Sequence, residues 1–109
     1  MTKNISVAND FTPFPFGRYR AEGKHSGEAF REDVLWPLLE RGEGVQVNLD
    51  GVLGGLGSSF LEEAFAGLLR VHRIPLHELQ SRLRIVSKED ANLVRRTWEY
   101  IERAATRQQ

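Results

Sequence analysis

The hydrophobic positions of this chain follow two different periods, and the change between them predicts strands separated by helices. Val45, Val47 and Leu49 are separated by single polar residues, which is the period of two residues typical of a half-buried strand. From Phe60 onward, apolar residues recur every three or four positions, as they do in an amphipathic helix. Four glycines occur within residues 51–57, and this density indicates a tight loop between the strand and the helix.

The period of two residues also occurs on either side of this central segment. The predicted strands cover residues 3–8, 17–23 (a short strand or an extended arm), 45–49 and 82–86. Apolar stripes of helical period separate the later strands and follow the last one. Strands that alternate with helices predict an α/β fold, here a mixed sheet of about four strands with helices packed against it.

Serine residues predict where three of the helices begin. Ser26 is a suitable N-cap for the helix before the central strand. Ser59 precedes Glu62 by three residues, and Ser87 precedes Asp90 by three residues, which is the spacing of a capping box. The second of these boxes is expected to start a long final helix, whose apolar side should pack on the sheet.

A length of 109 residues predicts a single domain. Its expected parts are an N-terminal strand and arm over residues 1–16, a core over 17–86 and a final helix over 88–108. The arm contains the segment Phe11–Phe16, in which two prolines exclude a central strand. Its three phenylalanines should either cover a sheet, that of this chain or of a neighbour, or form a docking surface.

Composition narrows the class of function. Fifteen basic and fifteen acidic residues give a net charge of zero, which argues against a binder of nucleic acid or of anionic membranes. The absence of cysteine excludes disulfides, thiol catalysis and cysteine-ligated zinc. No signal peptide and no long apolar run occur, so we expect a cytoplasmic protein.

The most suggestive chemistry is a pair of serines where the glycine-rich loop meets the central helix. A phosphate at the N-terminus of a helix meets free amides and the positive end of the helix dipole, so phosphorylation there need not unfold the domain. It would place about two negative charges on this surface. The alternative is structural: Ser59 caps the helix and Ser58 fills the loop. The candidate residues are Gly54, Gly55, Gly57, Ser58, Ser59, Phe60 and Glu62.

Other candidate sites are weaker. Arg18, Arg20, Lys24 and Arg31 could gather near the first helix and contact an anion, or they could form a solvated face with local ion pairs. The glycine spacing matches neither the dinucleotide fingerprint nor the P-loop, and the three histidines lack the spacing of a zinc motif, so no cofactor and no metal are predicted. The sequence offers no pairing of a nucleophile with a base, so we do not expect an enzyme.

The segment Ser58-Ser59-Phe60, followed by an acidic and apolar helix, resembles the uncharacterised STAS-like family. That family is related to the STAS domain of bacterial anti-sigma factor antagonists. The likeness extends from about residue 17 to residue 86 and includes residues 20–31 and Asp50-Gly51. It implies a small α/β domain that binds a protein partner. In the regulatory STAS proteins the partner is an ATPase-type kinase that is also the anti-sigma factor, and it phosphorylates the serine that matches Ser58.

The motif of this chain departs from the regulatory pattern at two positions. Gly57 stands where those proteins have an aspartate, and Phe60 stands where they have a glycine. These departures mean that the resemblance supports the fold better than it supports phosphorylation. As the resemblance implies, we expect a non-catalytic, regulatory protein-interaction domain with partner switching through Ser58 at the helix N-terminus, either as a monomer or as a homodimer. The alternative is a small-anion or nucleotide-binding domain that uses the same loop and helix N-terminus.

Overall fold

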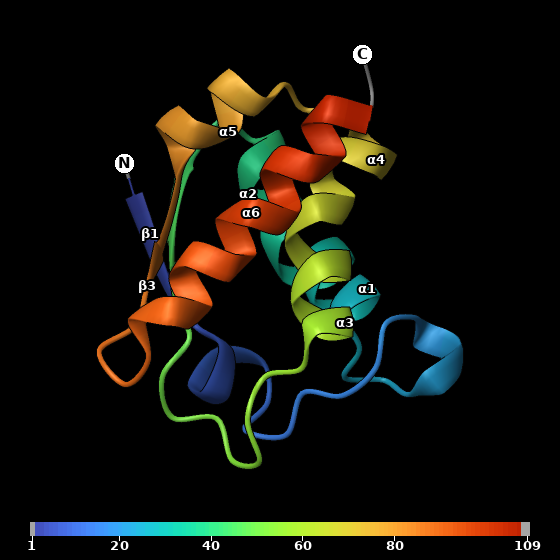
Figure 1. Ribbon diagram of the computed structural model, residues 1–109, viewed down its shortest axis with the longest axis vertical. Helices are drawn as coiled ribbons and strands as arrows, with labels where there is room; N and C mark the ends of the chain where they lie inside the picture. The colour runs from blue at the N-terminus through green and yellow to red at the C-terminus, as the bar shows by residue number, and fades with distance from the viewer. Residues whose placement is uncertain (1, 108–109) are drawn as a thin grey trace.

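Alternating apolar residues build a parallel sheet in the computed structural model, which describes residues 2–107. The strands are β1 (Thr2–Ser6), β2 (Gly44–Asn48) and β3 (Leu83–Val86). They lie in the order β1-β2-β3, with Val45 opposite both Lys3 and Leu83. Helices pack on one side of this sheet (Figure 1). Side chains at Val45 and Val47 face the helices and are buried, whereas Gln46 between them faces the open side and is only partly covered.

The predicted α/β class is confirmed, but the sheet differs from the prediction in two details. Within residues 2–107 it has three strands, and all of them are parallel. The segment expected as a short strand contains instead a 3-10 turn, Arg20–Glu22. The reason is local, because the Glu22 carboxylate accepts the backbone N–H groups of Arg18 and Tyr19 at 2.7 and 2.9 Å. Donors that a sheet neighbour would need are therefore already bonded.

Two long helical segments and a final helix form the second layer. The first segment runs through α1 (Gly27–Phe30), a wider π turn (Arg31–Leu35) and α2 (Trp36–Glu40). The second runs through α3 (Ser58–Leu61), another π turn (Glu62–Ala66) and α4 (Gly67–His72). A π turn (Val7–Phe11) follows β1, and α5 (Leu76–Arg82) leads into β3. The chain ends in α6 (Ala91–Arg107), and the predicted helix end at residue 108 lies outside the described residues.

One of the three predicted helix starts is confirmed. The buried Ser26 hydroxyl accepts the N–H of Ala29 at 3.1 Å and caps α1. The prediction for Ser59 is wrong, because the N-cap of α3 is Gly57, two residues earlier, and it makes no side-chain cap bond. The carboxylate of Glu62, which the predicted capping box required, pairs with an arginine instead.

The predicted box at Ser87 is shifted as well. The Ser87 hydroxyl accepts the N–H of Asp90 at 3.0 Å, as predicted. However, α6 begins only at Ala91, and the Asp90 carboxylate accepts the N–H of Asn92 at 3.0 Å. Asp90 therefore caps the helix, and Ser87 orders the turn that precedes it.

Helix α6 packs mainly against other helices and only in part against the sheet. It lies across the π turn Glu62–Ala66 and α4, and it also contacts α5 and β3 (Figure 1). Its buried side chains are Thr97, Ile101 and Ala104, while Val94, Trp98 and Ala105 on its apolar side are partly buried. Thr97 tolerates burial because its hydroxyl donates to the Leu93 carbonyl at 2.7 Å.

Aromatic rings fill the core between the two long helical segments. Phe30, Phe60 and Phe65 are fully buried and lie ring to ring, with centroids 5.9 to 6.2 Å apart. Gly27 permits this close approach, since a Cβ there would lie 2.6 Å from the carbonyl oxygen of Phe60. The start of α1 is thereby held directly against α3, beside the glycine-rich loop.

Candidate functional site

Three loops meet at the carboxyl end of the sheet, where parallel α/β proteins commonly bind their ligands. They are the arm over residues 11–17, the glycine-rich loop over 50–57 and the loop over 87–90, all at the bottom of Figure 1. The backbone N–H of Leu53 donates to the carbonyl of Pro13 at 2.8 Å, so the arm and the glycine-rich loop are joined.

Asp50 fixes the base of the glycine-rich loop. Its carboxylate accepts the hydroxyl of Ser87 at 2.7 Å and the N–H groups of Lys88 and Glu89 at 2.8 and 3.1 Å. The Ser87 hydroxyl is the main cause that holds the pKa of Asp50 below its usual value, and the Lys88 amide is the next. The Glu89 carboxylate in turn accepts the N–H of Gly51 at 3.1 Å. The loop therefore leaves the sheet in a defined direction.

A hollow of about 450 Å³ lies between the arm and the glycine-rich loop. Its lining comprises Pro15, Phe16, Gly17, Glu22, Gly54, Gly55, Gly57, Ser58, Ser59 and Phe60. Gly54 and Gly55 both have φ of +84°, a conformation that favours glycine. The fold thus brings six of the seven candidate residues together around one hollow, and the seventh, Glu62, lies one turn further along the helix.

Both serines present their hydroxyl groups to solvent. Ser58 and Ser59 occupy the first two positions of α3 and are exposed. Within the part of the chain that the structure describes, neither hydroxyl forms a hydrogen bond. A free, exposed hydroxyl at the start of a helix is sterically open to a modifying enzyme.

The phenylalanines of the arm divide between two environments. Phe11 packs on the core, with its ring centroid 5.1 Å from that of Phe30. Phe14 and Phe16 are 62% and 70% exposed, and Leu53 on the joined glycine-rich loop is 57% exposed. The arm therefore covers the core through one ring and leaves two rings in solvent, one of which, Phe16, lines the same hollow as the serines.

The cations proposed for an anion site have other partners or other positions. Arg18 donates to Glu62 at 2.5 Å, and this hydrogen bond is the main cause that lowers the pKa of Glu62. Arg20 forms a two-pronged pair with Asp33 at 2.8 and 3.0 Å. Lys24 is exposed. Arg31, the fourth of these cations, is buried. None of the four lines the hollow, whereas Glu22 does.

The structure also contains a buried ion-pair network that the sequence analysis missed. Arg31 is 3% exposed and donates to the carbonyl and the carboxylate of Glu63, both at 2.7 Å, and to Glu32 at 2.7 Å. Glu63 is 5% exposed and also accepts from Arg70 at 3.1 Å. The sequence contains one indication of this network, Gly67, which is a glycine inside a predicted helix. A Cβ at residue 67 would lie 2.1 Å from the Arg31 guanidinium, so the network requires glycine there.

Metal ligands are not gathered anywhere in the described part of the chain. Residues 2–107 contain no group of three or more histidine, aspartate or glutamate side chains that could hold a metal ion. His72 contacts Glu32 at 2.7 Å and stacks on Trp36, with ring centroids 4.0 Å apart. Over the same residues, no helix is both long and apolar enough to cross a membrane.

Comparison with known proteins gives one match. No curated protein and no solved structure matches the chain. Residues 26–92, more than half of the chain, match the family described as the STAS-like domain of unknown function. The matched segment runs from the cap of α1 to the start of α6 and includes the glycine-rich loop, both serines and Arg31, but not the arm. This chain therefore belongs to the family of STAS-like domains of unknown function.

Proposed function

We propose that this domain is a non-catalytic, regulatory module that binds another protein through the surface around the hollow. We name the exposed side chains of Phe14, Phe16 and Leu53 on the two joined loops, together with Ser58 and Ser59 beside Phe16, the docking surface. The observation that carries the proposal is that Phe16, 70% exposed, lines the same hollow as the two free serines.

Several exposed apolar side chains on two joined loops are typical of protein-binding surfaces. Single exposed apolar residues are common, but contiguous ones indicate an interface. A phenylalanine buries about 200 Å² in a contact, so covering the exposed part of Phe14 or Phe16 would contribute about 3 kcal/mol each before the costs of association. Two such rings supply enough gross free energy to anchor a partner.

The serines provide a means of regulating that contact. A phosphate on Ser58 would add about two negative charges beside Phe16. Glu22 already places a carboxylate in the hollow, and the backbone N–H groups of Tyr19 and Arg18 hold the pKa of Glu22 below its usual value, so this carboxylate is ionised at neutral pH. A partner that buries Phe16 would have to desolvate these charges, and it would dissociate from the phosphorylated domain. The family resemblance favours an ATPase-type kinase, or anti-sigma factor, as that partner.

The lining of the hollow favours a protein partner over a small phosphate-bearing ligand. It contains one acidic residue, two serines and otherwise apolar or glycine residues, but no lysine and no arginine. An anion would therefore lack a cationic side chain within the hollow itself.

The test is a pulldown from lysate of the native cell, read by mass spectrometry with phosphosite mapping. The baits are the wild type, Ser58→Ala, Ser58→Asp and Phe16→Ser, with Val71→Ser as a matched control, since Val71 is 52% exposed but lies on α4. We expect one protein to be retained by the wild type, Ser58→Ala and Val71→Ser, and to be lost from Ser58→Asp and Phe16→Ser. Phosphate should map to Ser58.

Unfolding measurements show whether a variant loses its partner only because it has lost its folded structure. Because Phe16 is mostly exposed, Phe16→Ser should change the free energy of unfolding by no more than about 0.5 kcal/mol. The proposal fails if all five baits retain the same proteins and Ser58 carries no phosphate. Loss from Phe16→Ser alone would keep the docking surface and remove the switch.

A further inference from the structure

Arginines gather at the end of the molecule away from the glycine-rich loop, where α4 ends beside the last turns of α6 (Figure 1). We name Arg70, Arg73, Arg103 and Arg107 the arginine cluster. The whole chain has no net charge, so this concentration of cations is a local feature of the fold.

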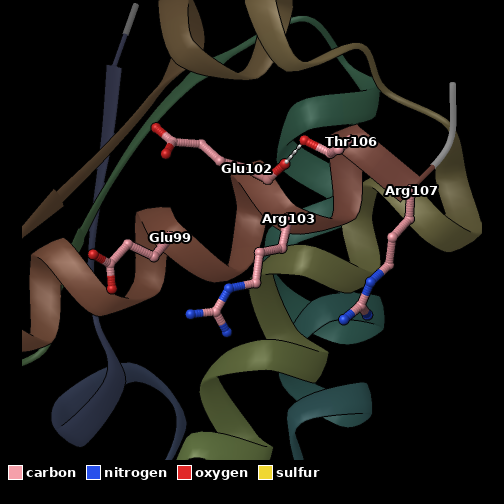
Figure 2. A pocket seen from close by; sticks show the side chains of 5 residues that line it. All are labelled: Glu99, Glu102, Arg103, Thr106 and Arg107. Carbon is pink, nitrogen blue, oxygen red and sulfur yellow. Dashed lines mark hydrogen bonds between the residues drawn. The ribbon is translucent and has the colours of Figure 1, made fainter.

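Two adjoining hollows carry these side chains. One, of about 270 Å³, is lined by Arg70, Arg73, Ala104 and Arg107. The other, of about 460 Å³, is lined by Glu99, Glu102, Arg103, Thr106 and Arg107. Arg107 belongs to both, so the hollows form one surface. Figure 2 shows Arg103 and Arg107 extending on the same side of α6, while the carboxylate of Glu102 points to the other side and Glu99 lies further toward the start of the helix.

The charges of the cluster are only partly balanced by nearby carboxylates, since Glu62, which pairs with Arg18, also attracts Arg70 and Arg107. Arg70 pairs with Glu63 at 3.1 Å, but within residues 2–107 the other three arginines form no ion pair. Glu99 pairs with Arg95 at 3.3 Å, which leaves the carboxylate of Glu102 as the one unpaired acid lining these hollows. Among the residues that line the two hollows, three arginines without an ion pair and one unpaired carboxylate leave a formal excess of two positive charges. Arg103 and Arg107 are also four residues apart on one helix, an arrangement that costs about 0.2–0.5 kcal/mol for like charges.

The backbone at Arg73 supports a role for its side chain. Arg73 has φ of 60° and ψ of 25° at the C-cap of α4, a left-handed conformation in which glycine is the usual residue. It is the one non-glycine residue with positive φ in the described part of the chain. The negative end of the α4 dipole attracts cations. The helix dipole alone therefore does not explain why an arginine, and not a glycine, occupies residue 73.

We propose that the arginine cluster is a binding site for an oxyanion with two negative charges, of the phosphate-monoester class. The excess of two positive charges matches such a ligand. Planar guanidinium groups donate paired hydrogen bonds to phosphate oxygens. Glu63 fixes Arg70 at one side of the site, and Arg73 and Arg107 are free to turn toward the ligand.

The experiment titrates the full chain with inorganic phosphate at neutral pH and constant ionic strength, and follows the arginine side-chain N–H signals by NMR. The variants are Arg73→Gly and Arg107→Gln, with Arg84→Gln as the matched control, because Arg84 is exposed on the open face of the sheet. We expect saturable binding by the wild type and the control, and affinity at least about tenfold lower in the two cluster variants. Arg73→Gly should stay folded and be no less stable than the wild type, since glycine adopts this conformation without strain.

A second titration distinguishes the source of the phosphate group. A phosphoserine peptide that binds more tightly than inorganic phosphate, while its unphosphorylated form does not bind, would identify a phosphorylated protein as the ligand. Tighter binding of inorganic phosphate would identify a free small molecule, and both results support the site. Absence of saturation, or equal affinity in Arg73→Gly and the wild type, would overturn the proposal and leave the arginines as partners of the helix end.

Discussion

Replacing Gly67 by alanine should force Arg31 out of its buried ion pairs. The guanidinium of Arg31 donates to the carbonyl and carboxylate of Glu63 and to the carboxylate of Glu32, each at 2.7 Å. A Cβ at residue 67 would lie 2.1 Å from Nη1 and 3.0 Å from Cζ of Arg31. Although the guanidinium ends a flexible side chain, it is buried and held by these bonds. Any shift that relieves the overlap must therefore break them.

The magnitude follows from two opposing effects. Removing one partner of a buried ion pair costs about 3–5 kcal/mol, because the other charge stays buried without compensation. Alanine within a helix is about 1 kcal/mol more favourable than glycine. The net loss for Gly67→Ala is thus about 2–4 kcal/mol, which lowers the melting temperature of a domain of this size by about 10–20 °C.

The assay is unfolding in urea, followed by circular dichroism, with Gly57→Ala as the matched control. Gly57 has φ of −76° and open space around a Cβ, so its replacement should cost no more than about 1 kcal/mol. In an Arg31→Met background the overlap is gone, and Gly67→Ala should be neutral or stabilising. Equal stability of Gly67→Ala and the wild type would refute this reasoning, as would an equal loss in both backgrounds.

Three further predictions concern single side chains. Arg18→Met should weaken the fall in the free energy of unfolding at acidic pH. The Arg18 hydrogen bond lowers the pKa of Glu62 below 4.5, so the pair stabilises the fold above that pH. This contribution is lost as the pH falls through the pKa of Glu62 in the folded protein. Ser26→Ala should lower the free energy of unfolding by about 1–2 kcal/mol through loss of a buried cap, while Ser59→Ala should change it by less than about 0.5 kcal/mol, both measured in urea. Asp50→Ala should speed hydrogen exchange at the backbone amides of Lys88 and Glu89, which donate to the Asp50 carboxylate, with little change at the centre of the sheet.

Local patterns predicted the elements of the fold well. The strand expected over residues 45–49 is β2, at Gly44–Asn48, and the one expected over 82–86 is β3, at Leu83–Val86. Ser26 was correctly assigned as a cap. These features depend on neighbouring residues, since a period of two or a cap three residues away is written within a few positions of the chain. The strand predicted over residues 17–23 does not form, because the Glu22 carboxylate accepts backbone N–H groups that a neighbouring strand would otherwise bind.

The candidate site was predicted in part. The glycine-rich loop and both serines do surround one hollow, as their closeness in the sequence suggested. The role of Ser59 as a cap was wrong, because Arg18, 41 positions earlier, takes the carboxylate that the capping box required. The local pattern could not reveal a competitor so distant in the chain.

By itself, then, the sequence determined the α/β alternation, the glycine-rich loop and the position of the serines, since each is a property of a few adjacent residues. Tertiary structure alone decided that Phe11 is covered while Phe16 stays exposed, and that Arg31 and Glu63 share a buried ion pair. It also decided that arginines from α4 and α6 meet at one surface. The physical reason is that burial and pairing depend on which segments pack together, and residues more than thirty positions apart acquire a common environment only when the chain has folded.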